Sequence, residues 1–338
     1  MPSLLEARNV TKIFGGGLFN RTRTVALDNF SMSIGDDKPS ITAVVGESGS
    51  GKTTLARLML GVTQPTEGRV LYKGQDLHKL TRLESRAFLS DVQVIFQDPF
   101  EVYNPFYQVD HVLTTPIDYM HLARTRDEKW HLIEDALETV GLRPEETLGR
   151  YPHQLSGGQR QRVMVARALI LKPKIILADE PVSMIDASLR ATVLGSLKRL
   201  KDEFGISIVY ITHDLTTAYQ ISDNIIVLYR GSVAEAGRVD EVVRNPSHPY
   251  TRLLVGSIPV PNPEHPWLAE SAPALSDANA RRGLSSCSFA DRCPAASPKC
   301  LQQTPPLYQT EAQRAVACFL YDQAPVLAAD QMDSVFHP

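Results

Sequence analysis

The nine residues GESGSGKTT, at positions 46–54, constrain the fold of this chain more than any other stretch. They follow a short run rich in β-branched residues, SITAVV (40–45), and lead into KTTLARLML (52–60), in which apolar residues recur at helical spacing. The pattern G-x-x-x-x-G-K-[ST] between a buried strand and a helix is typical of a loop whose backbone N–H groups surround phosphates. The sequence therefore predicts an α/β protein that binds a nucleotide.

Each residue type in this loop suits a phosphate. Glycines allow the backbone N–H groups to point into one concavity, and the helix that follows adds partial positive charge at its N-terminus. We expect Lys52 to reach the β- and γ-phosphates as a point charge, and Thr53 to offer its hydroxyl to Mg²⁺. The predicted nucleotide-binding residues are Gly46, Glu47, Ser48, Gly49, Ser50, Gly51, Lys52, Thr53 and Thr54.

Two adjacent acids end a second predicted strand, KIILADE (174–180). A third strand is predicted in GISIVYITHD (205–214), and helical segments between the strands indicate a mostly parallel sheet. Ligands of such sheets bind beyond the carboxyl ends of the strands. We therefore expect Asp179 to hold Mg²⁺ and Glu180 to polarise the water that attacks the γ-phosphate.

A second anion-binding helix start is predicted in LSGGQRQRVMVARAL (155–169), with Ser156 as its N-cap. Because the chain already has one phosphate loop, this second feature suggests that two chains share each nucleotide. Between 97 and 155 the pattern is helical, as in EKWHLIEDALETVGL (128–142), which predicts a helical subdomain inserted into the α/β core.

The composition excludes several other classes of protein. Hydrophobic residues make up 43% and charged residues 22% of the 338 residues, which is typical of a globular protein. The formal charge of −3 gives no basic surface for nucleic acid. No apolar run is long enough to span a bilayer, and MPSLLEARNV lacks the features of a signal peptide, so we expect any membrane contact to be made through a partner.

Six motifs, in this order and at this spacing, resemble those of the ATP-binding-cassette (ABC) ATPases, which are P-loop NTPases. They are GESGSGKTT, FQDPF, LSGGQRQR, IILADEP, SMID and ITHD, and the resemblance covers about the first 235 residues. It implies an ABC-type nucleotide-binding domain at 1–237, with its helical subdomain at about 98–165 and a small cysteine-containing extension at 238–338. ATP and Mg²⁺ are the implied ligands.

The resemblance also implies a role for individual residues. Gln97 contacts Mg²⁺ and reports to a transmembrane partner, Glu180 is the catalytic base and His213 senses the γ-phosphate. Asp186 belongs to a loop at the dimer interface, and Phe14 either stacks on adenine or is a core residue at a strand end. The γ-phosphate bound by the opposite subunit is contacted by a signature of four residues: Ser156, Gly157, Gly158 and Gln159.

Further motifs resemble one branch of the family, the ATPase subunits of oligopeptide and dipeptide importers. They are FQDPFEVYNP, YPHQLSGGQRQR, DEPVSMIDASLRA and the tail NPSHPYTRLLVGSIP (245–259), and the long stretch between Phe14 and Ala26 favours the second of the importer's two ATPase subunits. The implied partners are a distinct, paralogous ATPase chain, two transmembrane permease subunits and, through these, an extracytoplasmic solute-binding protein. The implied location is the cytoplasmic face of the inner membrane.

Two alternatives to a peptide importer stay open. The same branch also serves oligosaccharides, opines and metal chelates, and no residue of an ATPase subunit reads the cargo. The alternative of a different class is an ABC ATPase that acts on nucleic acid or ribosomes without a membrane partner. Proteins of that class typically carry two cassettes or a long coiled coil, and this chain shows neither.

All four cysteines lie near the end of the chain, at Cys287, Cys293, Cys300 and Cys318. A random placement would give such clustering roughly once in 2000 chains. The spacing C-x5-C-x6-C-x17-C matches neither tight zinc sites nor ferredoxin runs. Similar tails of peptide-importer ATPases imply a [4Fe–4S] cluster, and the alternatives are zinc and reduced or disulfide-paired thiols. We expect such a ligand to staple an extended, proline-rich tail (245–267) that lacks a core of its own.

Overall fold

The chain forms two compact units that are interleaved in the sequence. A computed structural model describes residues 3–15, 23–35, 38–98, 103–258 and 286–336. The helix-rich unit comprises Met1–Leu4, Ile34–Ile41 and Gln75–Ile211. The phosphate-loop unit comprises Leu5–Ser33, Thr42–Gly74 and Thr212–Pro338. The domain boundary at 237/238 stays a prediction. Two parts of the sequence patterns lie outside the described residues: Pro99 and Phe100 of the FQDPF motif, and most of the stretch between Phe14 and Ala26.

Three parallel strands form the sheet of the helix-rich unit: β6 (Val92–Ile95), β7 (Ile175–Asp179) and β8 (Ser207–Thr212). Ile175 is in register with Val92 on one side and with Ser207 on the other. All five residues of β7 are buried, which explains why the strand is apolar as far as Ala178, the residue before Asp179. The second and third predicted strands are thereby confirmed, and Asp179 and Glu180 stand at the carboxyl end of β7.

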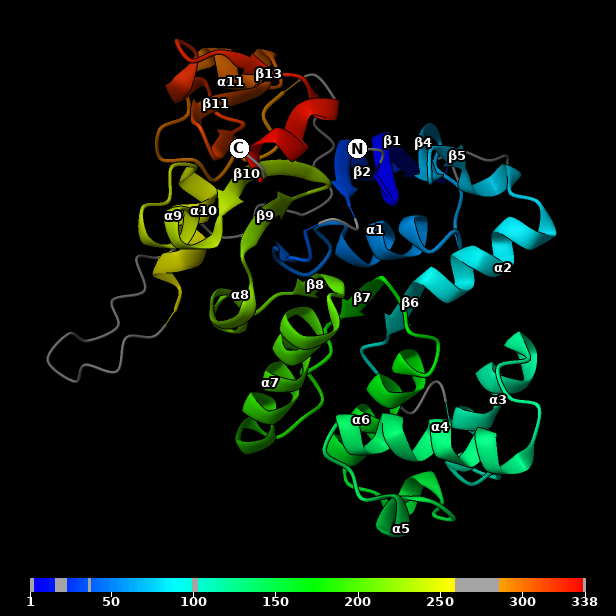
Figure 1. The fold of residues 1–338 in the computed structure, drawn as a ribbon. Coiled ribbons are helices and arrows are strands. Elements are labelled where there is room, and N and C mark those ends of the chain that lie inside the picture. The colour runs from blue at the N-terminus through cyan, green and yellow to red at the C-terminus, as the bar shows by residue number, and fades with distance from the viewer. Residues whose placement is uncertain (1–2, 16–22, 36–37, 99–102, 259–285, 337–338) are drawn as a thin grey trace, which may run out of the picture. The chain divides into compact units, whose positions relative to one another are not determined.

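Helices make up most of the remainder of this unit. They are α2 (Arg82–Asp91), α3 (Asp110–Met120), α4 (Arg126–Thr139), α5 (Pro144–Thr147), α6 (Gly157–Leu169) and α7 (Ala187–Phe204). Thr81 and Thr125 start α2 and α4 with capping boxes, in which a threonine hydroxyl and a glutamate satisfy free N–H groups. Figure 1 shows α3, α4, α5 and α6 gathered in one cluster, in which α3, α4 and α6 contact one another.

The phosphate-loop unit contains two groups of strands. In the first, β2 (Thr24–Ile34), β1 (Leu5–Phe14) and β4 (Glu67–Tyr72) lie side by side, with β1 and β4 antiparallel. In the second, β3 (Ile41–Val45) pairs in parallel with β9 (Asn224–Tyr229), and β9 pairs with the antiparallel β10 (Ser232–Arg238). The helices α1 (Lys52–Met59) and α8 (Leu215–Ile221) complete this part of the unit. The first predicted strand and helix are confirmed by β3 and α1.

The C-terminal extension is folded onto the edge of β10. Its strands follow β10 in the order β12 (Arg314–Val316), β11 (Leu307–Glu311) and β13 (Val326–Leu327), and β12 is antiparallel to β10. Its helices are α9 (Val239–Arg244), α10 (Pro249–Gly256) and α11 (Pro298–Gln302), and two short 3₁₀ turns cover Phe319–Tyr321 and Ala329–Val335. Several of its side chains are buried: Tyr250, Phe289, Tyr308, Val316, Met332 and Val335.

Two expectations about this extension are wrong. The stretch predicted to be extended contains helix α10, because Pro249 stands at the first helical position, where a missing N–H costs nothing, and His248 caps the helix by accepting the N–H of Tyr250. The extension also has a core of its own, and it covers a fully buried carboxylate of β10. Glu235 accepts the backbone N–H groups of Ser247 and His248, and its burial raises its pKa. The remainder of the predicted extended stretch, 259–267, lies outside the described residues.

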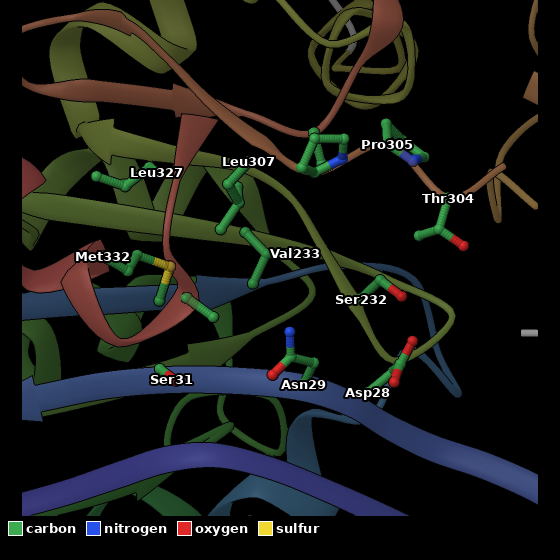
Figure 2. A pocket seen from close by; sticks show the side chains of 13 residues that line it. Asp28, Asn29, Ser31, Ser232, Val233, Thr304, Pro305, Leu307, Leu327 and Met332 are labelled. Atoms are coloured by element: carbon green, nitrogen blue, oxygen red, sulfur yellow. The ribbon is translucent and has the colours of Figure 1, made fainter. Parts of the chain in front are cut away.

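The extension also encloses a pocket of about 240 Å³ together with β2 and β10. Figure 2 shows Asp28, Asn29 and Ser31 of β2 below the pocket and residues of the extension around it. Burial, together with the nearby carboxylate of Glu67, raises the pKa of Asp28. The extension therefore packs on the face of β2 as well as on the edge of β10.

None of the helices in the described residues combines the length and the apolar character needed to cross a membrane.

Candidate functional site: a phosphate loop, a carboxylate pair and a cysteine pocket

The predicted phosphate loop connects β3 directly to α1. Two of its glycines, Gly49 and Gly51, have positive φ values of 79° and 104°, and Gly51 is the N-cap of α1. The loop is closed by a hydrogen bond from the N–H of Ser50 to the carbonyl of Glu47, 3.1 Å long. The N–H of Leu55 then donates to the carbonyl of Gly51, which begins the helix. This is the glycine-dependent winding that directs loop N–H groups toward an anion.

Lys52 lies within this loop. Its side chain is 6% exposed, and Nζ donates to the carbonyl oxygens of Gly46 at 2.8 Å and of Glu47 at 3.0 Å. A buried ammonium group beside the first turn of a helix supplies the positive charge that a phosphate needs. Thr53 and Thr54 follow in the first turn of α1, with Thr53 exposed.

Gly51 is a position where the loop tolerates no side chain. A Cβ atom there would lie 2.2 Å from the backbone oxygen of Ala26. Gly51→Ala should therefore lower the free energy of unfolding by more than about 3 kcal/mol, because both the left-handed backbone and the clash with backbone oppose the change. Chemical denaturation measures this. Gly74→Ala is a matched control, since its φ is +80° with open space around the added Cβ, and it should cost only about 1–2 kcal/mol. Equal losses in the two variants would contradict the geometry described for Gly51.

The carboxylate pair of the helix-rich unit stands at the end of β7. Asp179 is the last residue of the strand and is 9% exposed. Glu180 follows with a φ of +45°, a conformation that is rare outside glycine and is often found at functional sites. The N–H of Glu180 donates to the carbonyl of Ile211 at 2.8 Å, and its own carbonyl accepts from the Ser183 hydroxyl. The backbone around Glu180 is thus held on both sides.

Gln97 and Glu180, two residues predicted to be catalytic, are brought together. Gln97 follows β6, and its Nε2 donates to Oε2 of Glu180 at 3.1 Å, across 83 positions of sequence. Because β6 and β7 are adjacent parallel strands, residues just beyond their carboxyl ends meet at one edge of the sheet. An amide donor at this distance can orient the carboxylate for accepting a proton from water.

The signature segment begins helix α6 as predicted. Ser156 is the N-cap, with its Oγ accepting the N–H of Gln159 at 3.2 Å while Oε1 of Gln159 accepts the N–H of Ser156 at 2.9 Å. Gly158 allows a close approach, because a Cβ atom there would lie 3.0 Å from Cδ1 of Leu189 in helix α7. Asp186 precedes α7 as its N-cap, so the start of α6 lies beside the start of α7.

The two remaining residues predicted for the nucleotide site belong to the phosphate-loop unit. His213 is exposed and lies between the end of β8 and Asp214, whose side chain caps α8. Phe14 is the last residue of β1 and is 45% exposed, so it is not a core residue at the strand end. Nζ of Lys12 lies 5.2 Å from the centre of the Phe14 ring.

The four cysteines converge on one pocket of about 160 Å³ within the phosphate-loop unit. All four are free thiols. Burial raises the pKa of Cys287, Cys293 and Cys318, the last to about 11, and their mutual repulsion as thiolates adds to the shift. The pocket is also lined by His248, whose burial lowers its pKa to about 4, and by Phe289.

The types of residue that line this pocket suit a metal centre that prefers sulfur ligands, but the arrangement of their side chains does not. Thiolates are the ligands that iron–sulfur clusters and zinc prefer. Nevertheless, across the described ranges no three His, Cys, Asp or Glu side chains are arranged so that they could hold a metal ion. A shared ligand would therefore require the thiols to come closer together than they are in this structure.

Two residues that contact the loop went unrecognised from sequence as parts of the site. The hydroxyl of Tyr250 accepts the N–H of Glu47 at 3.0 Å, and the guanidinium of Arg292 forms an ion pair with the Glu47 carboxylate at 2.9 Å. Both residues stand in motifs that the resemblance identifies, HPYTR and DRCP, but nothing in their spacing indicates what they contact.

Comparisons with known proteins agree with this geometry. The ABC transporter family matches residues 27–183, and the C-terminal region of oligopeptide/dipeptide transporters matches residues 234–300. A putative oligopeptide transport ATP-binding protein of Bacillus subtilis, YkfD, is 41% identical, with 95% of this chain and 96% of the relative covered. The oligopeptide transport ATP-binding protein AppF of the same species is 40% identical over 94% of this chain and 98% of its own length.

A solved structure shares the fold. It is a dimeric ATP-binding cassette in a post-hydrolysis state, bound to ADP and phosphate. It is 30% identical to this chain with a TM-score of 0.61, and the match covers 70% of this chain and 98% of the solved one. With the phosphate loop, the carboxylate pair and the C-terminal region all matched, the chain belongs to the ABC transporter ATPases, in the branch of the oligopeptide and dipeptide transport ATP-binding proteins.

Proposed function

We propose that this chain is the ATP-hydrolysing subunit of a membrane importer and that its cargo is a peptide. The observation that carries the proposal is the combination, in one chain, of the phosphate loop at 46–54 with the oligopeptide/dipeptide transporter region at 234–300. The ABC family supplies the reaction, which is ATP hydrolysis coupled to transport. The relatives named for oligopeptide transport support the choice of cargo.

Within this function, each predicted site residue has a chemical task. Residues 46–54 bind the phosphates of ATP, with Phe14 against the adenine and His213 at the γ-phosphate. Glu180 accepts a proton from the attacking water, oriented by the amide of Gln97. Mg²⁺, which neutralises the developing charge on the phosphates, would be held by Thr53, Gln97 and Asp179.

A second ATPase chain completes the nucleotide site in this proposal. Ser156, Gly157, Gly158 and Gln159 begin helix α6, and the N-terminus of such a helix, with its partial positive charge, suits the γ-phosphate of ATP bound to a facing subunit. Asp186, beside this helix start, would contact the same partner. The dimeric state of the related cassette supports the pairing. We propose that this partner is a distinct, paralogous ATPase chain.

The other partners follow from the function. Transport requires a path through the membrane, which two permease subunits would supply, and an extracytoplasmic solute-binding protein would deliver the peptide to them. The chain would then be held at the cytoplasmic face of the inner membrane by its permease. Oligosaccharides, opines or metal chelates remain the alternative cargoes.

Reconstitution of the assembled transporter tests this function. The chain, its partner ATPase and the permeases are placed in liposomes, and uptake of a labelled peptide is measured with ATP and the solute-binding protein. We expect ATP-dependent uptake that unlabelled peptide competes for. Uptake of a sugar or metal chelate and not of peptide would contradict the proposed cargo. ATPase activity that depends on nucleic acid or ribosomes would contradict the proposed function.

We further propose that Cys287, Cys293, Cys300 and Cys318 hold one [4Fe–4S] cluster, with zinc as the alternative. Their convergence on a single pocket supports a common ligand, and such a ligand would cross-link the segment from 287 to 318 beside Pro249 at the start of α10. A cluster of this type supplies four Fe–thiolate bonds.

Anaerobic purification tests this ligand. We expect a brown protein with about four irons and four sulfides per chain, as the cluster type requires. The variant Cys300→Ser should lose most of the iron, because it removes one thiolate from the set. A colourless protein with one zinc would favour the alternative, and a protein with neither metal would contradict the proposal.

A further inference from the structure

The carboxylate of Glu47, in the phosphate loop, is held by an arginine of the C-terminal extension. Nη1 of Arg292 donates to Oε2 of Glu47 at 2.9 Å and Nη2 donates to Oε1 at 3.1 Å, across 245 positions of sequence. The Arg292 side chain is only 14% exposed, whereas that of Glu47 is 43% exposed. A two-pronged pair with one partner mostly buried fixes orientation as well as charge.

The guanidinium of Arg292 is itself held in place by aromatic rings. It lies 5.8 Å from the ring centres of both Tyr229 and Phe289, and Nη1 also donates to the hydroxyl of Tyr229 at 3.4 Å. Phe289 is 2% exposed and packs edge-on against Tyr229, with ring centres 5.1 Å apart. Arg292 therefore has a preformed position from which to contact the loop.

The backbone of the phosphate loop has further contacts in the same region. The buried hydroxyl of Tyr250 accepts the N–H of Glu47 at 3.0 Å. At the other end of the loop, the carbonyl of Ser50 accepts the N–H of Gly231 at 2.9 Å. Gly231 follows Arg230, whose Nη1 donates to the carbonyl of Ser288 at 3.4 Å. Both ends of the loop are thus connected to the extension.

The charge of Glu47 explains why such contacts matter. ATP brings about four negative charges to a loop that already carries this carboxylate, and like charges a few ångströms apart repel each other strongly where water is partly excluded. Pairing with Arg292 neutralises the carboxylate and holds it in a fixed place beside the loop. Nothing in the G-x-x-x-x-G-K-[ST] pattern requires an acid at this position. Whether the Glu47 carboxylate opposes ATP binding therefore depends on its pairing with Arg292.

We infer that Arg292 is a positioning residue for nucleotide binding: it neutralises and holds Glu47 so that the phosphate loop accepts ATP. The inference rests on the proposed function only in that ATP is the ligand of residues 46–54. It gives the cysteine pocket a purpose as well. Cys287 and Cys293 border the turn that carries Arg292, and the N–H of Cys287 donates to the carbonyl of Cys300 at 2.8 Å, so one side of that turn is tied to α11.

The test measures ATP affinity and turnover separately in the full chain. Arg292→Gln should raise the Kd for ATP about tenfold, which is the effect of losing one charge-assisted interaction. The kcat at saturating ATP should change less than twofold, because Arg292 touches no reacting atom. Arg292→Lys should recover part of the affinity, since it keeps the charge and loses the two-pronged geometry.

A double variant separates neutralisation from a merely structural role. In Glu47→Gln/Arg292→Gln the carboxylate that Arg292 offsets is gone, so the Kd for ATP should return to within about threefold of wild type. Arg244→Gln is the matched control, because Arg244 lies in the same extension but pairs with Asp240, and its Kd for ATP should equal that of wild type.

The inference is overturned if wild type binds ATP and Arg292→Gln binds it equally well. It is also overturned if the double variant binds ATP as weakly as the single variant. Failure of wild type to bind ATP at all would instead overturn the proposed function.

Discussion

Glu180→Gln should lower the rate of ATP hydrolysis at least about 100-fold while ATP binding is retained, because loss of a general base typically costs two to four orders of magnitude. Glutamine has the same shape, and its amide oxygen can still accept the hydrogen bond that Nε2 of Gln97 makes to Glu180 at 3.1 Å. Only the basicity of the carboxylate is lost. Phosphate release and ATP affinity, measured on the same preparation, separate the two effects.

The control for this variant is Glu203→Gln. Glu203 lies at the exposed end of α7, where it pairs with Arg199 across one helical turn, and its substitution should leave turnover unchanged. Turnover of Glu180→Gln at the wild-type rate would remove Glu180 from the role of base.

Lys52→Ala should weaken ATP binding about 100-fold, since it removes a buried ammonium group from the phosphate loop. In the structure Nζ donates to the carbonyls of Gly46 and Glu47, so the charge is already held inside the loop. The loss of charge-assisted contacts to two phosphates amounts to about 3 kcal/mol, and each 1.4 kcal/mol is about tenfold in affinity. Equilibrium binding of a fluorescent ATP analogue measures the change.

Lys198→Ala is the matched control for this substitution, because Lys198 is an exposed lysine on α7. Its affinity for the analogue should equal that of wild type. Wild-type affinity in Lys52→Ala would contradict the assignment of residues 46–54 as the phosphate site.

Much of the α/β core could be predicted from the sequence, because its signals are local. A buried parallel strand is a continuous apolar run, so β3, β7 and β8 stand out, and the loop pattern identifies the start of α1. Ser156 was recognisable as an N-cap because its hydroxyl satisfies an N–H only three residues further on.

The C-terminal extension was less predictable, because its structure depends on contacts between distant residues. Proline at 249 suggested an extended chain, but the same residue is favourable at the first position of a helix, and the sequence does not decide between the two. The pairing of β12 with β10 joins residues about 80 positions apart and has no local signal.

The contacts of the loop were missed for the same reason. The Arg292–Glu47 pair connects residues 245 positions apart, and a single arginine next to a cysteine has no periodicity that would reveal its partner. Phe14 shows the converse: its place at the end of a strand suggested a core residue as readily as a surface one, and only its exposure excludes the core. The sequence patterns assigned both Gln97 and Glu180 to catalysis but did not predict that their side chains contact each other.

The most direct test of the account is the structure of the assembled transporter that carries Glu180→Gln, solved with ATP and Mg²⁺. The account predicts that each ATP is enclosed by two polypeptides, with the loop 46–54 around its phosphates and the Ser156-capped helix start of the facing ATPase at the γ-phosphate. An ATP molecule contacted by one polypeptide alone would contradict the account.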